Sequence, residues 1–375
     1  MFIIIVLSIW TILHLYVFWR AASVPLIDRH VSGWLLIVVA VFLWASYPLA
    51  RILDSAGADF VARPLEFLGA NWIGVIFLLF SGLLVADVVS GFGFLLPRLA
   101  PSLRGWGLVV GAALAAIALV QGLRPPVIRN YEVRLASLPA DQDGTVLIVV
   151  SDLHLGTLLG ERWLAARIAQ IAALRPDLVV VAGDIIDGGG RSEDAMQPLL
   201  PTLRRLTAPL GVWAVTGNHE FYAGLDASVR FLEDAGFQVL RDRWAEVRPG
   251  LIIAGVDDLT ARRQFARNGD PLERALAGRP ESTATVFVSH TPWQADKAAR
   301  AGVGLMLSGH THDGQIWPFG YLVHPMYPLM GGRYEVGGMP VIVCRGTGTW
   351  GPRLRLWRPS EIVRIVLRAP SAARS

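Results

Sequence analysis

Four long apolar runs in the first 123 residues constrain this chain more than any other feature. Each run has 18 to 20 residues and contains no Asp, Glu, Lys or Arg. An α-helix needs ~20 apolar residues to cross a bilayer. The runs are residues 2–19, 31–50, 67–86 and 105–123. The sequence therefore predicts a multi-pass anchor of four transmembrane helices. The lipid bilayer is the predicted partner of this anchor.

The composition supports a membrane anchor joined to a more ordinary domain. The 375-residue chain is 53% hydrophobic and 17% charged, whereas soluble domains carry about 25% charged residues. Most of the charged residues follow residue 123. A cleavable signal peptide is the alternative for the first run, which nevertheless lacks a basic N-terminal region and a small-residue cleavage pattern.

Polar residues inside or beside the runs give three further expectations. Asp87 ends the third run, and we expect a solvated helix end there because its carboxylate can reach headgroup water. His14 is expected to form hydrogen bonds within the helix bundle. Arginines near the helix ends number five on the side of the C-terminal region and four on the other, which favours a cytoplasmic C-terminal domain.

Charge and cysteine content exclude some classes of function. A net charge of +4 is too small to call for nucleic acid as a partner. The single cysteine, Cys344, excludes an intramolecular disulfide and a cysteine-based zinc site. No feature of the sequence indicates an obligate protein partner.

The second half of the chain has the pattern of an α/β domain. We expect a linker over 124–144, the domain over 145–368 and a tail over 369–375. Short β-rich runs alternate with helical stretches in this domain. The predicted strands are 146–150, 178–182, 212–216, 251–256, 285–289 and 303–308, and the predicted helices are 161–174, 192–206 and 226–235.

The residues that follow five of these strands carry the chemistry. Five of the eight histidines lie at these positions, together with Asp and Asn side chains. They are Asp152, His154, Asp184, Asp187, Asn218, His219, His290, His310 and His312. Each motif alone is compatible with a turn, a helix cap or a hydrogen-bonded structural histidine. Because ligands bind outside the carboxyl ends of strands in open α/β sheets, the whole series favours one site.

The donor types predict two bound metal ions. Carboxylate oxygen, imidazole nitrogen and an amide oxygen, without thiolate, suit Mn, Fe, Zn or Co better than Ca or Mg. Seven candidate ligands are too many for one tetrahedral ion and suit two ions that share a carboxylate: Asp152, His154, Asp184, Asn218, His290, His310 and His312. Two metal ions held in this way bind the oxygens of a phosphoryl group and supply hydroxide at neutral pH. The predicted reaction is hydrolysis of a phosphate ester or anhydride, with His219 protonating the leaving group and Asp187 orienting His219.

The motif order DLH, GDIID, GNHE, SH and GHTH resembles the calcineurin-like metallophosphoesterase family. The resemblance implies two packed mixed β-sheets flanked by helices over about residues 145–368. It implies one metal held by Asp152, His154, Asp184 and His312, and another held by Asp184, Asn218, His290 and His310. In this scheme Asp184 bridges the metals, and His219 is the general acid with Asp187 as its partner.

Departures from the family narrow the expected substrate. Asp187-Gly188-Gly189 stands where the serine/threonine phosphatases of the superfamily have Asp-Arg-Gly, which argues against a protein phosphatase. The segment 345–362 resembles that of a bacterial subgroup of the family whose members sit at membranes. Members of this subgroup are similar to UDP-diacylglucosamine pyrophosphatases. The resemblance therefore implies a location in the bacterial inner membrane and a lipid-linked substrate. Asp313 stands where that subgroup usually has Gly, which affects substrate contacts.

Candidate substrate contacts are Arg345, Arg353, Tyr222 and Trp317. The aromatic stretch 316–321 either reaches the membrane interface or packs the base of the loop after the site. One alternative function is a broad-specificity phosphomonoesterase or phosphodiesterase without lipid preference. An alternative of another class is a membrane transport or scaffold protein that a metal-binding domain regulates.

Overall fold

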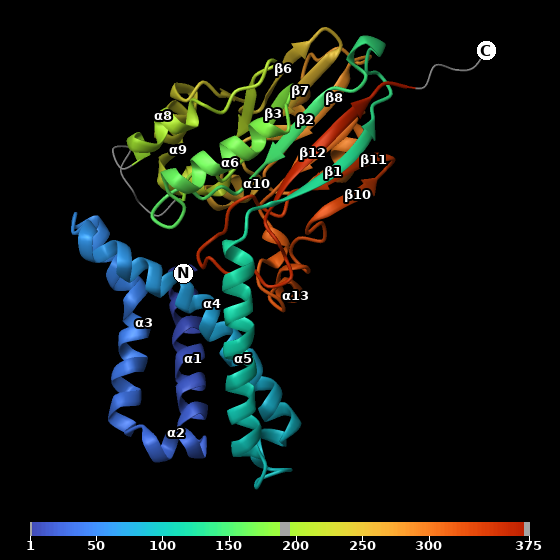
Figure 1. Ribbon diagram of the computed structural model, residues 1–375. Helices are drawn as coiled ribbons and strands as arrows, with labels where there is room; N and C mark the ends of the chain where they lie inside the picture. The colour runs from blue at the N-terminus through green and yellow to red at the C-terminus, as the bar shows by residue number, and fades with distance from the viewer. Residues whose placement is uncertain (1, 188–195, 371–375) are drawn as a thin grey trace. The chain divides into compact units, whose positions relative to one another are not determined.

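The computed structural model describes residues 2–187 and 196–370, which divide into two units (Figure 1). A helical unit comprises Met1–Arg124 and Gly351–Trp357. A metal unit, named for its candidate site, comprises Pro125–Trp350 and Arg358–Ser375. Gly188, Gly189 and the first part of the predicted helix 192–206 lie outside the described residues.

Each of the four apolar runs forms a helix of the helical unit. The elements are α1 (Phe2–Ala22), α2 (Pro25–His30), α3 (Gly33–Ser55), α4 (Asp59–Val89), η1 (Gly91–Gly93) and α5 (Ala100–Leu123). Within the described part of the chain, three helical segments are long and apolar enough to cross a membrane: Gly33–Asp54, Phe60–Val89 and Ala100–Leu123. The apolar stretch of α1, Val6–Ala22, is shorter. By length and composition, the described residues therefore contain three candidate membrane spans and one shorter apolar helix.

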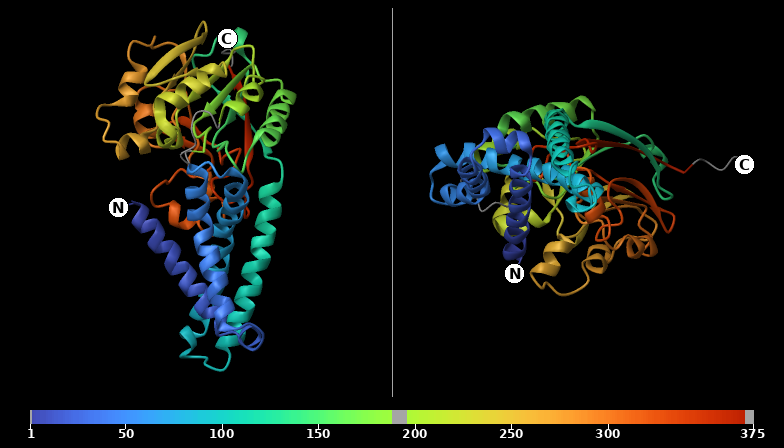
Figure 2. Two further views of the ribbon diagram at one scale, coloured as in Figure 1. Left: turned by 90° about the vertical axis from the view of Figure 1, so that its left-hand side faces the viewer. Right: turned by 90° about the horizontal axis from the view of Figure 1, so that it is seen from below.

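Helix α4 packs against α1, α3 and α5 (Figure 1, Figure 2). Small residues allow the closest approach, since a Cβ atom on Gly82 would lie 2.2 Å from the carbonyl oxygen of Gly107. In lipid, helices gain little from the hydrophobic effect and associate through such close backbone packing. His14 behaves as predicted: its Nδ1 donates to the carbonyl of Trp10 at 2.8 Å, and its Nε2 accepts from Trp72 at 2.9 Å.

The expectation of a solvated Asp87 is wrong. Its side chain is fully buried, and one carboxylate oxygen lies 2.6 Å from Nε of Arg20 and accepts from the Tyr16 hydroxyl at 2.6 Å. The other oxygen accepts from Nε of Arg104 at 2.8 Å. The hydropathy profile places Asp87 at the end of a run, but it cannot show that arginines from two other helices meet there.

Two six-stranded mixed sheets form the metal unit (Figure 1). The first has the order β1-β12-β2-β3-β4-β5, and the second has the order β10-β11-β9-β8-β7-β6. The first contains β1 (Val127–Arg134), β2 (Val146–Val150), β3 (Leu178–Ala182), β4 (Val212–Val215), β5 (Gln238–Val239) and β12 (Glu361–Arg368). The second contains β6 (Arg243–Arg248), β7 (Leu251–Gly255), β8 (Ala284–Val288), β9 (Leu305–Ser308), β10 (Gly332–Val336) and β11 (Met339–Val343).

Alternation along the strands builds the layers. In β2, Leu147 and Val149 join the core between the sheets, while Ile148 and Val150 join the core beneath the helices. Helices α6 (Glu161–Ala173), α8 (Leu200–Leu203) and α9 (Asn218–Asp234) cover the first sheet. Helices α11 (Pro271–Leu276) and α12 (Ala295–Arg300) cover the second. The predicted fold of two packed mixed sheets flanked by helices is confirmed.

The predicted linker over 124–144 is wrong, because this segment contains strand β1. Strand β1 pairs in parallel with β12 at the edge of the first sheet, with Val127 opposite Glu361. Val133 is the one fully buried residue of β1, so the strand lacks the apolar alternation that reveals a strand in sequence. Its place depends on backbone pairing with a partner more than 200 residues away.

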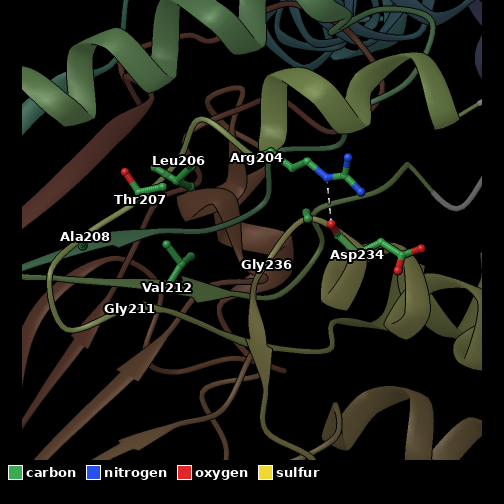
Figure 3. Close-up of a pocket in the computed structure, with 9 residues that line it drawn as sticks. Arg204, Leu206, Thr207, Ala208, Gly211, Val212, Asp234 and Gly236 are labelled. Atoms are coloured by element: carbon green, nitrogen blue, oxygen red, sulfur yellow. Dashed lines mark hydrogen bonds between the residues drawn. The ribbon is translucent and has the colours of Figure 1, made fainter.

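A surface pocket lies away from the candidate site (Figure 3), and its lining residues are Arg204, Leu206, Thr207, Ala208, Gly211, Val212, Asp234, Ala235 and Gly236. Gly211 and Val212 stand at the beginning of β4, whereas Asn218 and His219 follow its end. The pocket therefore opens at the opposite end of the sheet. There Arg204 donates to the carbonyl of Asp234 at 3.0 Å.

Candidate metal centre

Parallel pairing brings the predicted site residues to one edge of the sheets. Strands β2, β3 and β4 run parallel, as do β7, β8 and β9. The residues after β2, β3, β8 and β9 form groups of carboxylate and imidazole side chains able to hold divalent metal ions. Most of these side chains are buried, which is unusual for ionisable groups unless they have partners.

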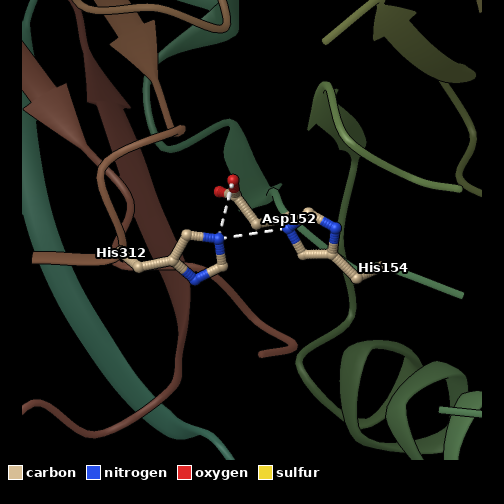
Figure 4. A group of neighbouring side chains, drawn as sticks. All are labelled: Asp152, His154 and His312. Carbon is tan, nitrogen blue, oxygen red and sulfur yellow. Dashed lines mark hydrogen bonds and ion pairs between the residues drawn. The ribbon is translucent and has the colours of Figure 1, made fainter. Parts of the chain in front are cut away.

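The first cluster consists of Asp152, His154 and His312 (Figure 4). Nε2 of His154 lies 3.1 Å from Nε2 of His312, which lies 3.3 Å from Oδ1 of Asp152. Burial and the nearby His219 lower the pKa of His154 to about 3, so this ring is neutral at physiological pH. Two ring nitrogens that face each other at this distance suit a shared cation, because the nitrogen of an imidazole can present a lone pair to a metal ion.

The second cluster consists of Asp184, His290 and His310. Nε2 of His290 lies 3.1 Å from Oδ2 of Asp184 and 3.3 Å from Nδ1 of His310. Nδ1 of His290 donates to the carbonyl of Ala182 at 2.6 Å, which directs Nε2 into the cluster. Oδ2 of Asp184 is also 3.9 Å from Nε2 of His154, so Asp184 borders both clusters.

Asn218 supplies an amide oxygen whose surroundings suit a cation. Its Oδ1 is buried and has no hydrogen-bond partner within the described ranges. Its two neighbours in the chain approach Asp184 closely: the His219 amide donates to Oδ1 of Asp184 at 2.9 Å, and Gly217 packs against the same carboxylate. A buried amide oxygen without a hydrogen bond costs free energy, which a bound cation would offset.

Left-handed backbone conformations gather at the candidate ligands. Five of them have φ between 44° and 71°: Asp152, His154, Asp184, His310 and His312. This conformation costs roughly 1–2 kcal/mol for each residue with a side chain. Such strain is tolerated chiefly where function requires an exact side-chain position.

Two motif glycines are required by close packing. A Cβ atom on Gly217 would lie 2.0 Å from Oδ1 of Asp184, and one on Gly309 would lie 2.6 Å from Oδ2 of Asp152. Any larger residue at either position would displace a candidate metal ligand. The glycines in GNHE and GHTH are therefore part of the site.

Glu220 organises the site and was not among the predicted residues. Its buried carboxylate accepts from the amides of Asp184 at 3.0 Å, Ile185 at 2.8 Å and Gly217 at 2.6 Å. It thereby ties the loop after β3 to the start of α9. Burial and the neighbouring Asp184 raise its pKa. The signal in the sequence is an acidic residue at the third position of a helix, which by itself indicates only a helix cap.

His219 and Asp187 lie beside the clusters as a pair. Nδ1 of His219 is 3.4 Å from Oδ1 of Asp187, and the His219 ring meets the His154 ring edge-on with 4.6 Å between centroids. Burial opposes a charge on His219, but Asp184 and the hydrogen bond to Asp187 raise its pKa to about 9. The pair can therefore hold a proton next to the candidate ligands.

The four candidate substrate contacts do not all lie beside the clusters. The Tyr222 ring lies 5.5 Å from the His219 ring, and its hydroxyl donates to Gln264 at 2.5 Å. Trp317 is 36% exposed and lies five residues after His312. Arg353 belongs to the helical unit, where its backbone amide donates to Asn71 at 2.9 Å.

Arg345 is held by carboxylates, one of which is Asp313. Its Nε donates to Asp313 at 2.9 Å, and its Nη1 donates to Glu361 at 3.2 Å. Nε of Arg358 lies 3.3 Å from the same Asp313 oxygen. Asp313 thus draws two arginines together directly after the candidate ligand His312.

The sandwich of two sheets with Asp and His clusters at its strand ends defines a metallophosphoesterase. Residues 145–314 match the calcineurin-like phosphoesterase family. The chain is 32% identical to an uncharacterized metallophosphoesterase of Aquifex aeolicus, over 64% of this chain and 91% of that protein. The chain belongs to the calcineurin-like metallophosphoesterase family.

Two vertebrate relatives extend the likeness to membrane proteins. The chain is 34% identical to the transmembrane protein with metallophosphoesterase domain of Danio rerio, over 70% of this chain and 62% of that protein. It is 30% identical to the Bos taurus protein of the same name, over 70% and 61% of the two chains. The chain thus spans about three fifths of the length of these relatives. Together with the apolar helices, they indicate a membrane-associated metallophosphoesterase.

Proposed function

We propose that the protein is a membrane-bound hydrolase that uses two divalent cations to cleave a phosphodiester or pyrophosphate. The observation that carries the proposal is the position of Asp184, which borders both clusters. We assign Asp152, His154, Asp184 and His312 to one cation, and Asp184, Asn218, His290 and His310 to the other. The donor set favours Mn, Fe, Zn or Co. Cations bound there would polarise the phosphoryl group and activate the attacking water.

His219 is the proposed general acid. Nδ1 of His219 lies 3.4 Å from Oδ1 of Asp187, and the proposed role has Nε2 of His219 protonate the leaving-group oxygen. The negative charges of Asp184 and Asp187 keep a proton on the ring until the bond to the leaving group breaks. A positioned acid of this kind contributes about 10²–10⁴-fold to the rate.

The dependence on the leaving group tests this assignment. The purified full-length protein, loaded with Mn²⁺, is assayed with a nitrophenyl diester and with an alkyl diester. His219→Ala should slow cleavage of the alkyl diester far more, because an alkoxide needs a proton and nitrophenolate does not. His30→Ala, an exposed histidine of the helical unit, is the matched control. Equal losses on the two substrates would exclude His219 as the general acid.

We further propose a lipid-linked substrate, such as a UDP-diacylglucosamine-like precursor. The membrane anchor supports this proposal, as do exposed aromatic residues soon after His312. Trp317 is 36% exposed, Phe319 40% and Tyr321 73%. Rings of this kind favour the membrane interface. Turnover of a nucleotide-linked lipid in vesicles should exceed turnover of a soluble diester, and equal turnover would favour the broad-specificity alternative.

We place the protein in the bacterial inner membrane as a multi-pass protein with the metal unit in the cytoplasm. The arginine count of the short loops supports this orientation. A fluorescent reporter that matures only in the cytoplasm, fused after Ser375, should fluoresce. A periplasmic phosphatase reporter at the same position should be inactive, and the reverse pattern would place the metal unit on the other side.

A further inference from the structure

Two exposed aromatic rings lie beside His219, the proposed general acid. The centroid of the Tyr222 ring is 5.5 Å from that of the His219 ring, and the centroid of the Trp350 ring is 6.5 Å from it. The planes of the two rings make angles of 62° and 79° with the imidazole plane. Tyr222 is 41% exposed and Trp350 is 53% exposed, so each ring presents much of its surface to a ligand.

Trp350 ends the segment 346–350, which contacts the loop of the first cluster. The amide of Gly348 donates to the carbonyl of Asp152 at 3.0 Å. A Cβ atom on Gly348 would lie 2.4 Å from the carbonyl oxygen of Leu153, so the segment approaches this loop as closely as only glycine permits. The backbone just before the indole ring is therefore tied to a candidate metal ligand.

Gln315 holds the backbone of Trp350 itself. Its Nε2 donates to the Trp350 carbonyl at 3.0 Å, and its Oε1 accepts from the Trp350 amide at 3.0 Å. Gln315 is buried and lies three residues after the candidate ligand His312. Two loops that carry ligands of the first cluster thus fix the position from which the indole ring reaches His219.

Tyr222 is held by separate contacts. It lies on α9, three residues after His219. Its hydroxyl donates to Oε1 of Gln264, the last residue of α10 (Leu259–Gln264), at 2.5 Å. Its ring centroid lies 6.4 Å from that of Phe265. These contacts orient the phenol ring before any ligand binds.

The place of the rings determines which part of a substrate they can contact. An oxygen that takes a proton from His219 must lie within hydrogen-bond distance of it, so the group attached to that oxygen lies near Tyr222 and Trp350. Rigid rings favour flat partners, because a flat group keeps contact over a whole ring face. A flexible acyl chain gains less, since ordering it costs conformational entropy.

We propose that Tyr222 and Trp350 bind a flat aromatic group on the leaving-group side of the substrate. The inference rests on the proposed function, because His219 defines that side of the substrate as its general acid. It assigns the two rings as residues that determine specificity for the part of the substrate that departs with the proton.

Two diesters that differ in flatness test the proposal: dibenzyl phosphate and bis(cyclohexylmethyl) phosphate. Both release primary alcohols of similar size and acidity, so both need the proton of His219 to a similar extent. The full-length protein in detergent, loaded with Mn²⁺, should cleave dibenzyl phosphate with a kcat/KM about tenfold higher or more. This factor lies within the range for stacking of a flat group on an aromatic side chain.

Trp350→Leu and Tyr222→Leu should each raise the KM for dibenzyl phosphate about fivefold or more and leave its kcat unchanged, because stacking stabilises the bound substrate and the transition state alike. Cleavage of bis(cyclohexylmethyl) phosphate should not change. Trp350→Phe and Tyr222→Phe keep a ring and should retain the preference for dibenzyl phosphate. Trp357→Leu, at an exposed tryptophan of the helical unit, is the matched control.

A nucleobase and a simple aryl group share this chemistry, and inhibitors distinguish them. If adenosine inhibits cleavage of dibenzyl phosphate more strongly than ribose does, the flat group is a nucleobase. If benzyl alcohol inhibits and adenosine does not, it is a simple aryl group.

The outcomes separate this inference from the proposed function. Equal kcat/KM values for the two diesters in the wild type would overturn the role of the rings. Leucine variants that retain the preference, or that lose activity equally on both diesters, would overturn it too. Wild-type protein that cleaves neither diester with Mn²⁺ would overturn the proposed function itself.

Discussion

The two units of this protein both bury carboxylates, but they satisfy them in different ways. In the helical unit, Asp87 forms ion pairs with Arg20 and Arg104 and accepts a hydrogen bond from Tyr16, so the chain itself supplies the balancing charge. In the metal unit, Asp152 and Asp184 lie among imidazoles, several of whose nitrogens face one another.

In the first arrangement two arginines balance the carboxylate, whereas in the second the amide oxygen of Asn218 has no hydrogen-bond partner among the described residues. Burial of charge alone therefore does not mark a functional site. The informative feature is a set of metal-binding atoms that face one another while the chain supplies too few protons and positively charged side chains to balance them.

The largest effect is expected at the carboxylate that borders both clusters. Asp184→Asn should reduce hydrolysis of a generic phosphodiester by the Mn²⁺-loaded protein to background, because a neutral amide cannot balance two cations. Asp226→Asn, at an exposed position of α9, is the matched control and should retain full activity. Undiminished turnover by folded Asp184→Asn would contradict the assignment of this site.

The second effect concerns stability of the helical unit. Asp87→Asn should destabilise the protein in detergent by about 3–5 kcal/mol, because two buried arginines lose their counter-charge. Thermal unfolding measures the effect, with the exposed Asp28→Asn as control. The same variant should bind Mn²⁺ as the wild type does. A stability change as small as that of the control would show that Asp87 is not needed to balance the arginines.

A third prediction is that only the metal unit is stabilised by cations. A cation present at 100 times its dissociation constant stabilises the folded state by about 2.7 kcal/mol. Mn²⁺ should therefore raise the unfolding temperature of the wild type and of Asp87→Asn, but raise that of Asp184→Asn much less. If the Mn²⁺-dependent rise were equal in all three proteins, the ion would be acting outside the clusters.

The smallest effect is expected at Glu220. Glu220→Gln replaces an oxygen that accepts backbone amides with an NH₂ group, which cannot accept them. The cost should be about 1–3 kcal/mol of folding free energy, with weaker Mn²⁺ binding as the loops after β3 and β4 loosen. Glu233→Gln, near the end of α9, serves as the control for a Glu to Gln change on this helix. Unaltered stability and Mn²⁺ affinity would mean that other contacts hold the two loops.

The candidate ligands were predictable because their signal is local. Each follows a short apolar strand directly, and parallel strands that pair as neighbours bring their carboxyl ends together. The structure accordingly brings Asp152, His154 and His312 into one cluster and Asp184, His290 and His310 into the other. Helix α9 begins at Asn218 and is kinked at Gly224, where φ is 105°, so the helix predicted from residue 226 corresponds to its second part. Glu220 fastens the first part, because its carboxylate accepts from the Gly217 amide.

Other features could not be predicted from local patterns. Strand β1 has no apolar alternation and depends on a distant partner. The helix predicted over 192–206 is described only as η3 (Gln197–Leu199) and the short α8.

The sequence by itself determined the division into an apolar helical region and an α/β region. It also determined the order along the chain of the residues that follow the strands and the types of donor atom available to a metal. These properties depend on hydropathy and on residues near in the chain. The tertiary structure alone decided which buried charges are balanced, because Asp87 meets arginines from other helices. Hydrogen bonds and ion pairs act over a few ångströms, so only the folded chain determines which distant residues can form them.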